Sequence, residues 1–215
     1  QLIASGVIPM DSGIHDELIK VTKNGVSVQD VLNPHARWKL SDLPTGSQFV
    51  SAIETHDYER VMDRWEAFGP GALKAAMWAM LSMTRGPVMI YDRQEQGEVH
   101  RIRIDNHTFH NFDEANRQRY YAQLDFQKLW GESVEEFYQR ILEYYKKHSA
   151  LFDGQNYIIE TGLDQVFAII RYNDKDTEIL VINLGWGSYH FNLDLKGLPS
   201  WLKERFDSKD NYLTI

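Results

Sequence analysis

The chain of 215 residues contains no cysteine. This absence excludes disulfide bonds and thiolate metal sites, and it leaves the redox compartment undefined. Long hydrophobic runs are also absent: none approaches the length that spans a bilayer, so we expect neither a membrane-spanning helix nor a signal peptide. The sequence is silent on the cell compartment.

Positive charge is scarce as well. The chain has 23 Lys and Arg residues against 31 Asp and Glu residues, which gives a formal net charge of -8. A nucleic acid or an anionic membrane would favour clustered cations, so we expect neither as a partner, and a neutral ligand fits better. With 43% hydrophobic residues the chain can bury a core, as one large domain or two small ones.

An apolar run followed by ionisable groups marks residues 48–57, which read Gln-Phe-Val-Ser-Ala-Ile-Glu-Thr-His-Asp. This pattern is typical of a buried parallel strand that delivers side chains into a site at its carboxyl end. His56 and Asp57, with Arg60 three residues later, are therefore candidate site residues. The alternative is a surface loop with a solvated carboxylate, because a His-Asp pair also arises by chance.

Strand-like and helix-like segments alternate around this stretch. Residues 2–10 and 87–91 are two more short apolar runs, and residues 14–23 and 73–84 have the composition of helices. The second of these helices is apolar on nearly every face, so it should be buried. The order strand, helix, strand, helix, strand indicates parallel βαβ units rather than hairpins.

Two regions are polar. Residues 26–47 read mostly as loop or short helix. In residues 99–111, Asp105, His107 and His110 could ligate a metal, but a polar excursion loop is the preferred interpretation, because nothing there fixes the ligand geometry. We predict no metal site and no cofactor from the sequence; calcium in a longer parent protein stays open.

Ser133 and Glu136 form a capping-box pattern at the start of an amphipathic helix that extends to residue 148. After residue 152 the character changes to short β-rich runs separated by turn residues, at 157–159, 166–172, 179–184 and 189–195. Their close spacing predicts an antiparallel meander. Trp186 and Tyr189 are candidates for a platform that stacks on sugar rings, against the commoner alternative of buried or edge-capping aromatics.

Three stretches, in this order, resemble the α-amylase family of glycoside hydrolases. Residues 49–60 are similar to the segment at the family's seventh barrel strand, with Thr55 where Asn is usual. Residues 86–97 are similar to the eighth strand and its Gln/Asp-Glu-x-Gly turn, although Asp-Arg replaces the customary Tyr-Gly. The helix at 133–148 is similar to the eighth barrel helix, which leads into the family's all-β C-terminal domain.

The resemblance implies an α/β plus all-β architecture. Residues 1–152 would form the last part of a (β/α)8 TIM barrel, about strands six to eight, and residues 153–215 an antiparallel β-sandwich domain. The family's nucleophile and acid/base follow the fourth and fifth strands, so neither is assigned to this chain. The missing N-terminal part of the barrel is then an expected partner.

The resemblance also implies an activity: retaining hydrolysis of, or transglycosylation on, an α-glucan such as starch or a maltooligosaccharide. Asp57 matches the family's third, transition-state-stabilising carboxylate, and His56 its substrate-binding neighbour. Arg60 would bind substrate, orient the loop or pair with a carboxylate. The chain alone should be inactive. The alternative is a non-catalytic amylase-like or carbohydrate-binding domain.

Overall fold

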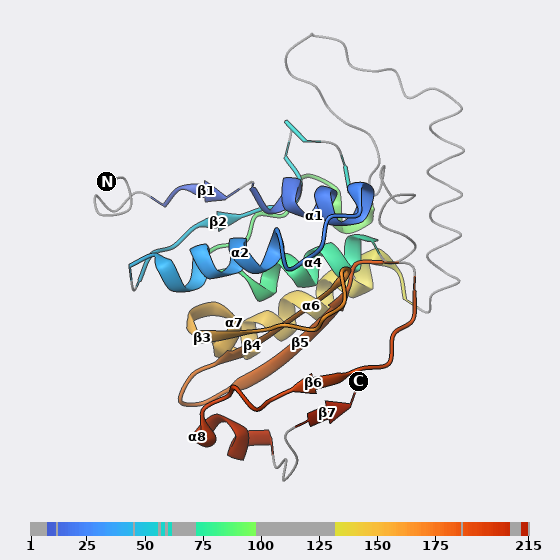
Figure 1. Ribbon diagram of the computed structural model, residues 1–215. Coiled ribbons are helices and arrows are strands. Elements are labelled where there is room, and N and C mark those ends of the chain that lie inside the picture. Colours follow the sequence, from blue (N-terminus) through green and yellow to red (C-terminus); the bar gives the residue numbers. More distant parts are fainter. Residues whose placement is uncertain are drawn as a thin grey trace, which may run out of the picture.

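The computed structural model describes residues 8–11, 13–44, 46–55, 57–58, 60–61, 72–97, 132–185, 187–206 and 212–214. Its elements, in chain order, are β1 (Met10–Asp11), α1 (Gly13–Asn24), α2 (Leu32–Arg37), the π-helix η2 (Trp38–Asp42), β2 (Val50–Ser51), α4 (Ala72–Ser82), the 3-10 helix η4 (Gln94–Gln96), α6 (Val134–Lys147), α7 (Ser149–Asp153), β3 (Gln155–Ile159), β4 (Val166–Tyr172), β5 (Thr177–Asn183), β6 (Asn192–Asp194), α8 (Ser200–Lys203), the 3-10 helix η5 (Glu204–Phe206) and β7 (Tyr212–Thr214). Figure 1 shows α2, α4 and α6 between the β1–β2 pair and the β3–β4–β5 sheet, with α1 beside the strand pair. Within the described part of the chain, no helix has the length and apolar character needed to cross a membrane.

The strand segments of the N-terminal part run parallel. Met10 of β1 is in register with Val50 of β2, and Ser51 forms a parallel bridge with Val88. The prediction of parallel pairing is confirmed, but the strands are much shorter than the apolar runs at 48–53 and 87–91 suggest. Proline at positions 9 and 87 lacks an N–H and removes one hydrogen bond from each ladder. The predicted residues 2–7 lie outside the described part of the chain.

The helices of this part agree with the sequence pattern. Helix α1 covers the predicted range 14–23, and the short-helix alternative for 26–47 is confirmed by α2 and η2. Helix α4 buries most of its length, as its composition predicts; its buried side chains include Leu73, Ala76, Met77, Ala79, Met80 and Leu81. Helix α4 contacts α6 and the strands β4 and β5, and its buried side chains belong to the main hydrophobic cluster.

Helix α6 begins with the predicted capping box. The Ser133 hydroxyl accepts a hydrogen bond from the Glu136 N–H at 3.1 Å, and the Glu136 carboxylate accepts one from the Ser133 N–H at 2.8 Å. Two N–H groups that an isolated helix end leaves unpaired are thereby satisfied. The apolar face of α6 is buried, and the backbone becomes extended at His148, where the short α7 follows.

The C-terminal part contains the predicted antiparallel meander. Strand β4 pairs with β3 on one side and β5 on the other. Alternate residues of β4 enter different cores: Phe167 and Ile169 pack towards the helices, while Ala168 and Ile170 pack with Leu193 and its neighbours near β6. Both faces of this sheet are therefore covered. The arrangement as a β-sandwich stays a prediction.

The fourth predicted strand, 189–195, is shorter than expected. Only Asn192–Asp194 form β6, which pairs with β7. Tyr189 and His190 are exposed, so no burial fixes the register of the first half of this run.

One hydrophobic core joins the two sides of residue 152. Ile14, Ile53 and Met77 belong to the same cluster as Phe167 and Ile169 of β4. The buried Arg171 adds a polar link across the same junction: its guanidinium donates to the carbonyl oxygens of Ser82 at 2.7 Å, Thr84 at 3.1 Å and Gly154 at 3.2 Å. The division into domains 1–152 and 153–215 stays a prediction, and any such domains share this core.

Candidate functional site

The carboxyl ends of three parallel segments meet at one edge of the N-terminal part. Asp11 ends β1 beside Ser51 of β2, and Ser51 lies beside Val88. The residues that follow β2 and Val88 therefore leave the sheet on the same side. This edge carries Asp57 and Arg60, which both lie within the described part of the chain.

Asp57 lies in a tight turn that Thr55 organises. The Asp57 N–H donates to the Thr55 hydroxyl at 3.1 Å, and the Tyr58 N–H donates to the Thr55 carbonyl oxygen at 3.3 Å. Thr55 is buried and Asp57 is exposed. A Thr hydroxyl and an Asn side chain can both accept from a backbone N–H two residues on, so Thr55 can hold the turn where Asn is usual. His56 lies outside the described residues.

Arg60 is an internal partner of the same loop. Its guanidinium lies 2.9 Å from the Glu54 carboxylate, both side chains are 1% exposed, and the second Glu54 oxygen accepts from the Val61 N–H at 2.8 Å. The Arg60 guanidinium also lies over the Tyr91 ring, 4.3 Å from its centroid. This geometry matches pairing with a carboxylate and orientation of the loop. A direct contact between Arg60 and substrate stays a prediction.

Two further groups fix this edge, and the sequence reasoning missed both. His15 of α1 donates from Nδ1 to the Ile53 carbonyl oxygen at 2.8 Å, and its ring lies 4.5 Å from that of Tyr58. The second group is Glu54. The sequence could have indicated it, because a carboxylate within an apolar strand run requires a buried partner. A single His on a helix gives no such signal.

The turn after Val88 is held by Gln94. Its side-chain oxygen accepts from the Tyr91 N–H at 3.1 Å, and its amide group donates to the Tyr138 hydroxyl of α6 at 2.5 Å. Burial raises the pKa of Tyr138 well above its ordinary value, so this hydroxyl stays neutral. Arg93 and Gly97, on either side of η4, both have positive φ, 58° and 72°. The turn is thus fixed relative to α6.

A buried ionic cluster supports the edge from the helix side. Lys39 Nζ lies 2.6 Å from Asp11 Oδ2 and 2.6 Å from Ser51 Oγ, and His35 Nε2 lies 3.2 Å from the same Asp11 oxygen. Burial alone would raise the pKa of Asp11, but hydrogen bonds from His35 and Lys39 outweigh it and hold this pKa well below the usual range. Burial lowers the pKa of Lys39 more than Asp11 raises it. The cluster therefore holds an ionised Asp11 that positions β1 against β2.

Acid should unfold the protein in part through Asp11. Because the folded-state pKa of Asp11 lies below the unfolded value of about 4, its contribution to the unfolding free energy is complete above pH ~4 and is lost as the pH falls further. We expect Asp11→Asn to be less stable at neutral pH and to lose less stability between about pH 4 and 2. Urea unfolding across this range measures both. The exposed Asp42→Asn is the matched control, and equal pH slopes for wild type and Asp11→Asn would contradict the assignment.

Other candidate residues are placed as follows. Tyr189 is 36% exposed on the loop before β6, and Trp186 lies outside the described residues. Asp105, His107 and His110 also lie outside them. Their proposed roles are therefore not tested by the structure.

No protein-family model and no curated protein sequence matches the chain. Solved structures do resemble it: an α-amylase from H. orenii (19% identity, TM-score 0.58, covering 85% of this chain and 40% of that one), a debranching enzyme from Nostoc punctiforme (15%, TM-score 0.64, 89% and 39%), and a cyclic α-maltosyl-(1→6)-maltose hydrolase from Arthrobacter globiformis in complex with maltose (15%, TM-score 0.62, 96% and 42%). The chain thus spans about two fifths of the length of these proteins. It has the fold of the C-terminal part of α-amylase-family enzymes.

Proposed function

We propose that this chain is the C-terminal part of a retaining glycoside hydrolase or transglycosidase that acts on α-glucans, and that Asp57 stabilises its transition state. The observation that supports this best is the position of Asp57: an exposed carboxylate in a fixed turn, at the edge where the carboxyl ends of β1, β2 and the segment at Val88 meet. Barrel enzymes carry their catalytic groups at this edge.

The proposed mechanism assigns Asp57 no covalent step. A retaining glycosidase uses a nucleophile and an acid/base about 5–5.5 Å apart, and both would come from the part of the barrel that precedes this chain. Asp57 accepts a hydrogen bond from a sugar hydroxyl, and this bond strengthens as the ring approaches its oxocarbenium-like transition state. His56 donates to the same sugar. The Glu54–Arg60 pair positions the loop that carries both.

The partner in this proposal is the preceding part of the barrel. Ile8 and Met10, at and beside β1, are 45% and 46% exposed, which is unusual for large apolar side chains at a parallel strand. Further barrel strands would cover this apolar side. The segment 1–152 would then complete the barrel with strands six to eight, and 153–215 would follow as the β-sandwich domain. The chain alone would hydrolyse no glucan.

The reading frame that encodes the chain tests this proposal against its alternative. An enzyme requires an upstream region with alternating strands and helices, and with Asp and Glu at the ends of the fourth and fifth strands. The intact mass of the natural protein should match such a frame. A frame without that region would instead favour a non-catalytic amylase-like or carbohydrate-binding domain.

A further inference from the structure

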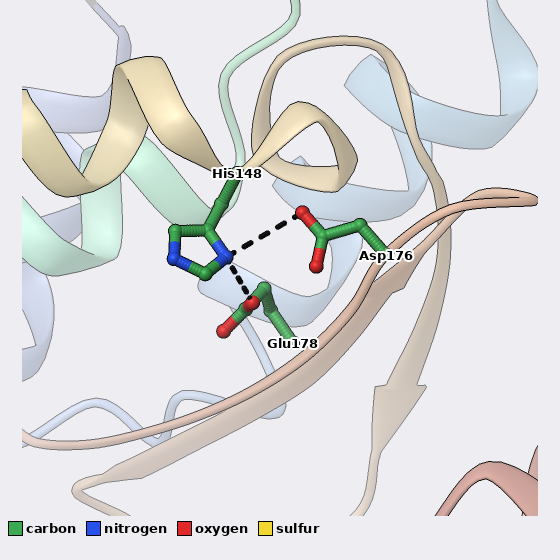
Figure 2. Close-up of side chains that lie close together, drawn as sticks. All are labelled: His148, Asp176 and Glu178. Carbon is green, nitrogen blue, oxygen red and sulfur yellow. Dashed lines mark ion pairs between the residues drawn. The ribbon is translucent and has the colours of Figure 1, made fainter.

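A histidine and two carboxylates converge on the side of the molecule where α6 meets the β3–β4–β5 sheet. His148 lies between α6 and α7, Asp176 lies in the turn before β5, and Glu178 belongs to β5 itself. Figure 2 shows the imidazole facing both carboxylates. His148 Nδ1 lies 2.5 Å from Glu178 Oε1 and 3.5 Å from Asp176 Oδ2.

We propose that these three side chains bind a divalent transition-metal ion, with zinc as the best fit. One imidazole nitrogen and two carboxylate oxygens are ligands that zinc accepts, whereas calcium and magnesium prefer oxygen alone. The three ligand atoms lie within 4.8 Å of one another. A zinc ion about 2.0–2.2 Å from each ligand in tetrahedral geometry needs ligand atoms about 3.3 Å apart. The distance between Asp176 Oδ2 and His148 Nδ1 already fits. Glu178 Oε1 would have to move away from His148 Nδ1 by less than about 1 Å.

The surroundings hold these ligands in place. The Tyr144 hydroxyl donates to Glu178 Oε2, which leaves Oε1 directed at His148. The Tyr144 ring also stacks on the imidazole, with centroids 3.9 Å apart and planes 17° apart. A hydrogen bond to the outer oxygen of a ligating carboxylate is a common feature of metal sites. One residue, Tyr144, thus orients two of the three ligands.

The turn that carries Asp176 is also fixed. The Asn173 side-chain oxygen accepts from the N–H groups of Lys175 and Asp176, both at 2.9 Å, and its amide group donates to the Ser149 hydroxyl at 2.8 Å. The Arg205 guanidinium donates to the Thr177 hydroxyl at 2.9 Å and to the Asn173 carbonyl oxygen. Little conformational entropy is therefore lost when an ion binds.

Access and charge suit an ion. The side chains of His148, Asp176 and Glu178 are 30%, 21% and 14% exposed, so a cation can enter and keep a water molecule as a fourth ligand. The ion would join α6 to β5 and so stabilise the junction between the helical layer and the sheet.

Calorimetric titration of the chelator-treated whole chain with zinc chloride tests this proposal. We expect one site in the micromolar range, at least 100-fold weaker binding in His148→Gln and in Glu178→Gln, and about tenfold weaker binding in Tyr144→Phe, which keeps the stacked ring but loses the hydroxyl. His190→Gln and Glu143→Gln, which change an exposed His and an exposed Glu, should bind as wild type does.

X-ray absorption spectroscopy at the zinc edge, recorded on the zinc-bound wild-type chain, gives an independent result if a variant folds poorly. It should show one imidazole nitrogen and carboxylate oxygens at about 2.0–2.2 Å. Equal zinc affinity in wild type and His148→Gln would overturn the proposal, and so would wild-type binding weaker than millimolar. Neither result bears on the role of Asp57, so failure of the zinc site leaves the proposed function standing.

Discussion

Asp57→Asn should lower the turnover number of the parent enzyme by about two to three orders of magnitude. The substitution keeps the volume and a hydrogen-bonding group but removes the negative charge that acts on the positively charged sugar in the transition state. A charge-assisted hydrogen bond is roughly twice as strong as a neutral one, and a preorganised group of this kind is commonly worth about 3–4 kcal/mol of the barrier. Steady-state kinetics on a maltooligosaccharide measures the effect.

The relative changes in turnover number and Michaelis constant distinguish this role of Asp57 from a structural one. The Michaelis constant should change much less than turnover, because the lost interaction belongs mainly to the transition state. Asp57 is exposed, so the melting temperature should stay nearly constant. His56→Ala should do less harm, since it removes a neutral donor. Asp174→Asn, an exposed aspartate in the β4–β5 turn, is the matched control. Normal turnover in Asp57→Asn would return His56 and Asp57 to the surface-loop interpretation.

Arg171→Met should destabilise the folded chain by about 2–4 kcal/mol. The change keeps an apolar stem but leaves the carbonyl oxygens of Ser82, Thr84 and Gly154 without this donor. Hydrogen bonds to a charged group contribute about 1.5–3 kcal/mol each. Part of this is offset, because burial lowers the pKa of Arg171 to about 10, and removing the charge relieves that cost. The melting temperature should fall by about 5–15 °C.

An exposed arginine provides the comparison for Arg171. Arg37 pairs with Glu160 at 2.6 Å, but the two side chains are 52% and 57% exposed. Such surface pairs contribute at most about 1 kcal/mol, so Arg37→Met should change the unfolding free energy very little. Differential scanning calorimetry of both variants makes the test. A similar small effect in both would mean that Arg171 does not join α4 to the sheet in the way the geometry indicates.

Local patterns predicted the elements that depend on near neighbours in the chain. The capping box at Ser133 and Glu136 needs only a three-residue spacing, and the β3–β4–β5 meander needs only short turns between β-rich runs. The lengths of the strands were harder to predict, because strand pairing depends on neighbouring segments that are distant in the sequence. The apolar run at 48–53 forms only the two-residue β2, and that at 87–91 forms a single bridge at Val88.

In the candidate site, too, contacts between near neighbours were easier to predict than contacts between distant positions. The turn at Asp57 depends on a local contact with Thr55, and the role of Asp57 stays a prediction. The partner of Arg60 was predicted only as a carboxylate. Its identity as Glu54 depends on how the loop folds back. The cluster of His148, Asp176 and Glu178 had no sequence signal, because His148 precedes Asp176 by 28 residues (176 − 148) and the spacing of the three follows no ligand motif.

The anomeric form of the first product tests the central claim most directly. Proton NMR can follow the parent enzyme as it acts on a maltooligosaccharide, before mutarotation mixes the two forms. The proposed function predicts that the α-anomer appears first, because a retaining enzyme passes through a covalent glycosyl intermediate. First release of the β-anomer would mean inversion and a different placement of the carboxylates. No product at all would contradict the assignment of this chain to a glycosidase and favour a sugar-binding role.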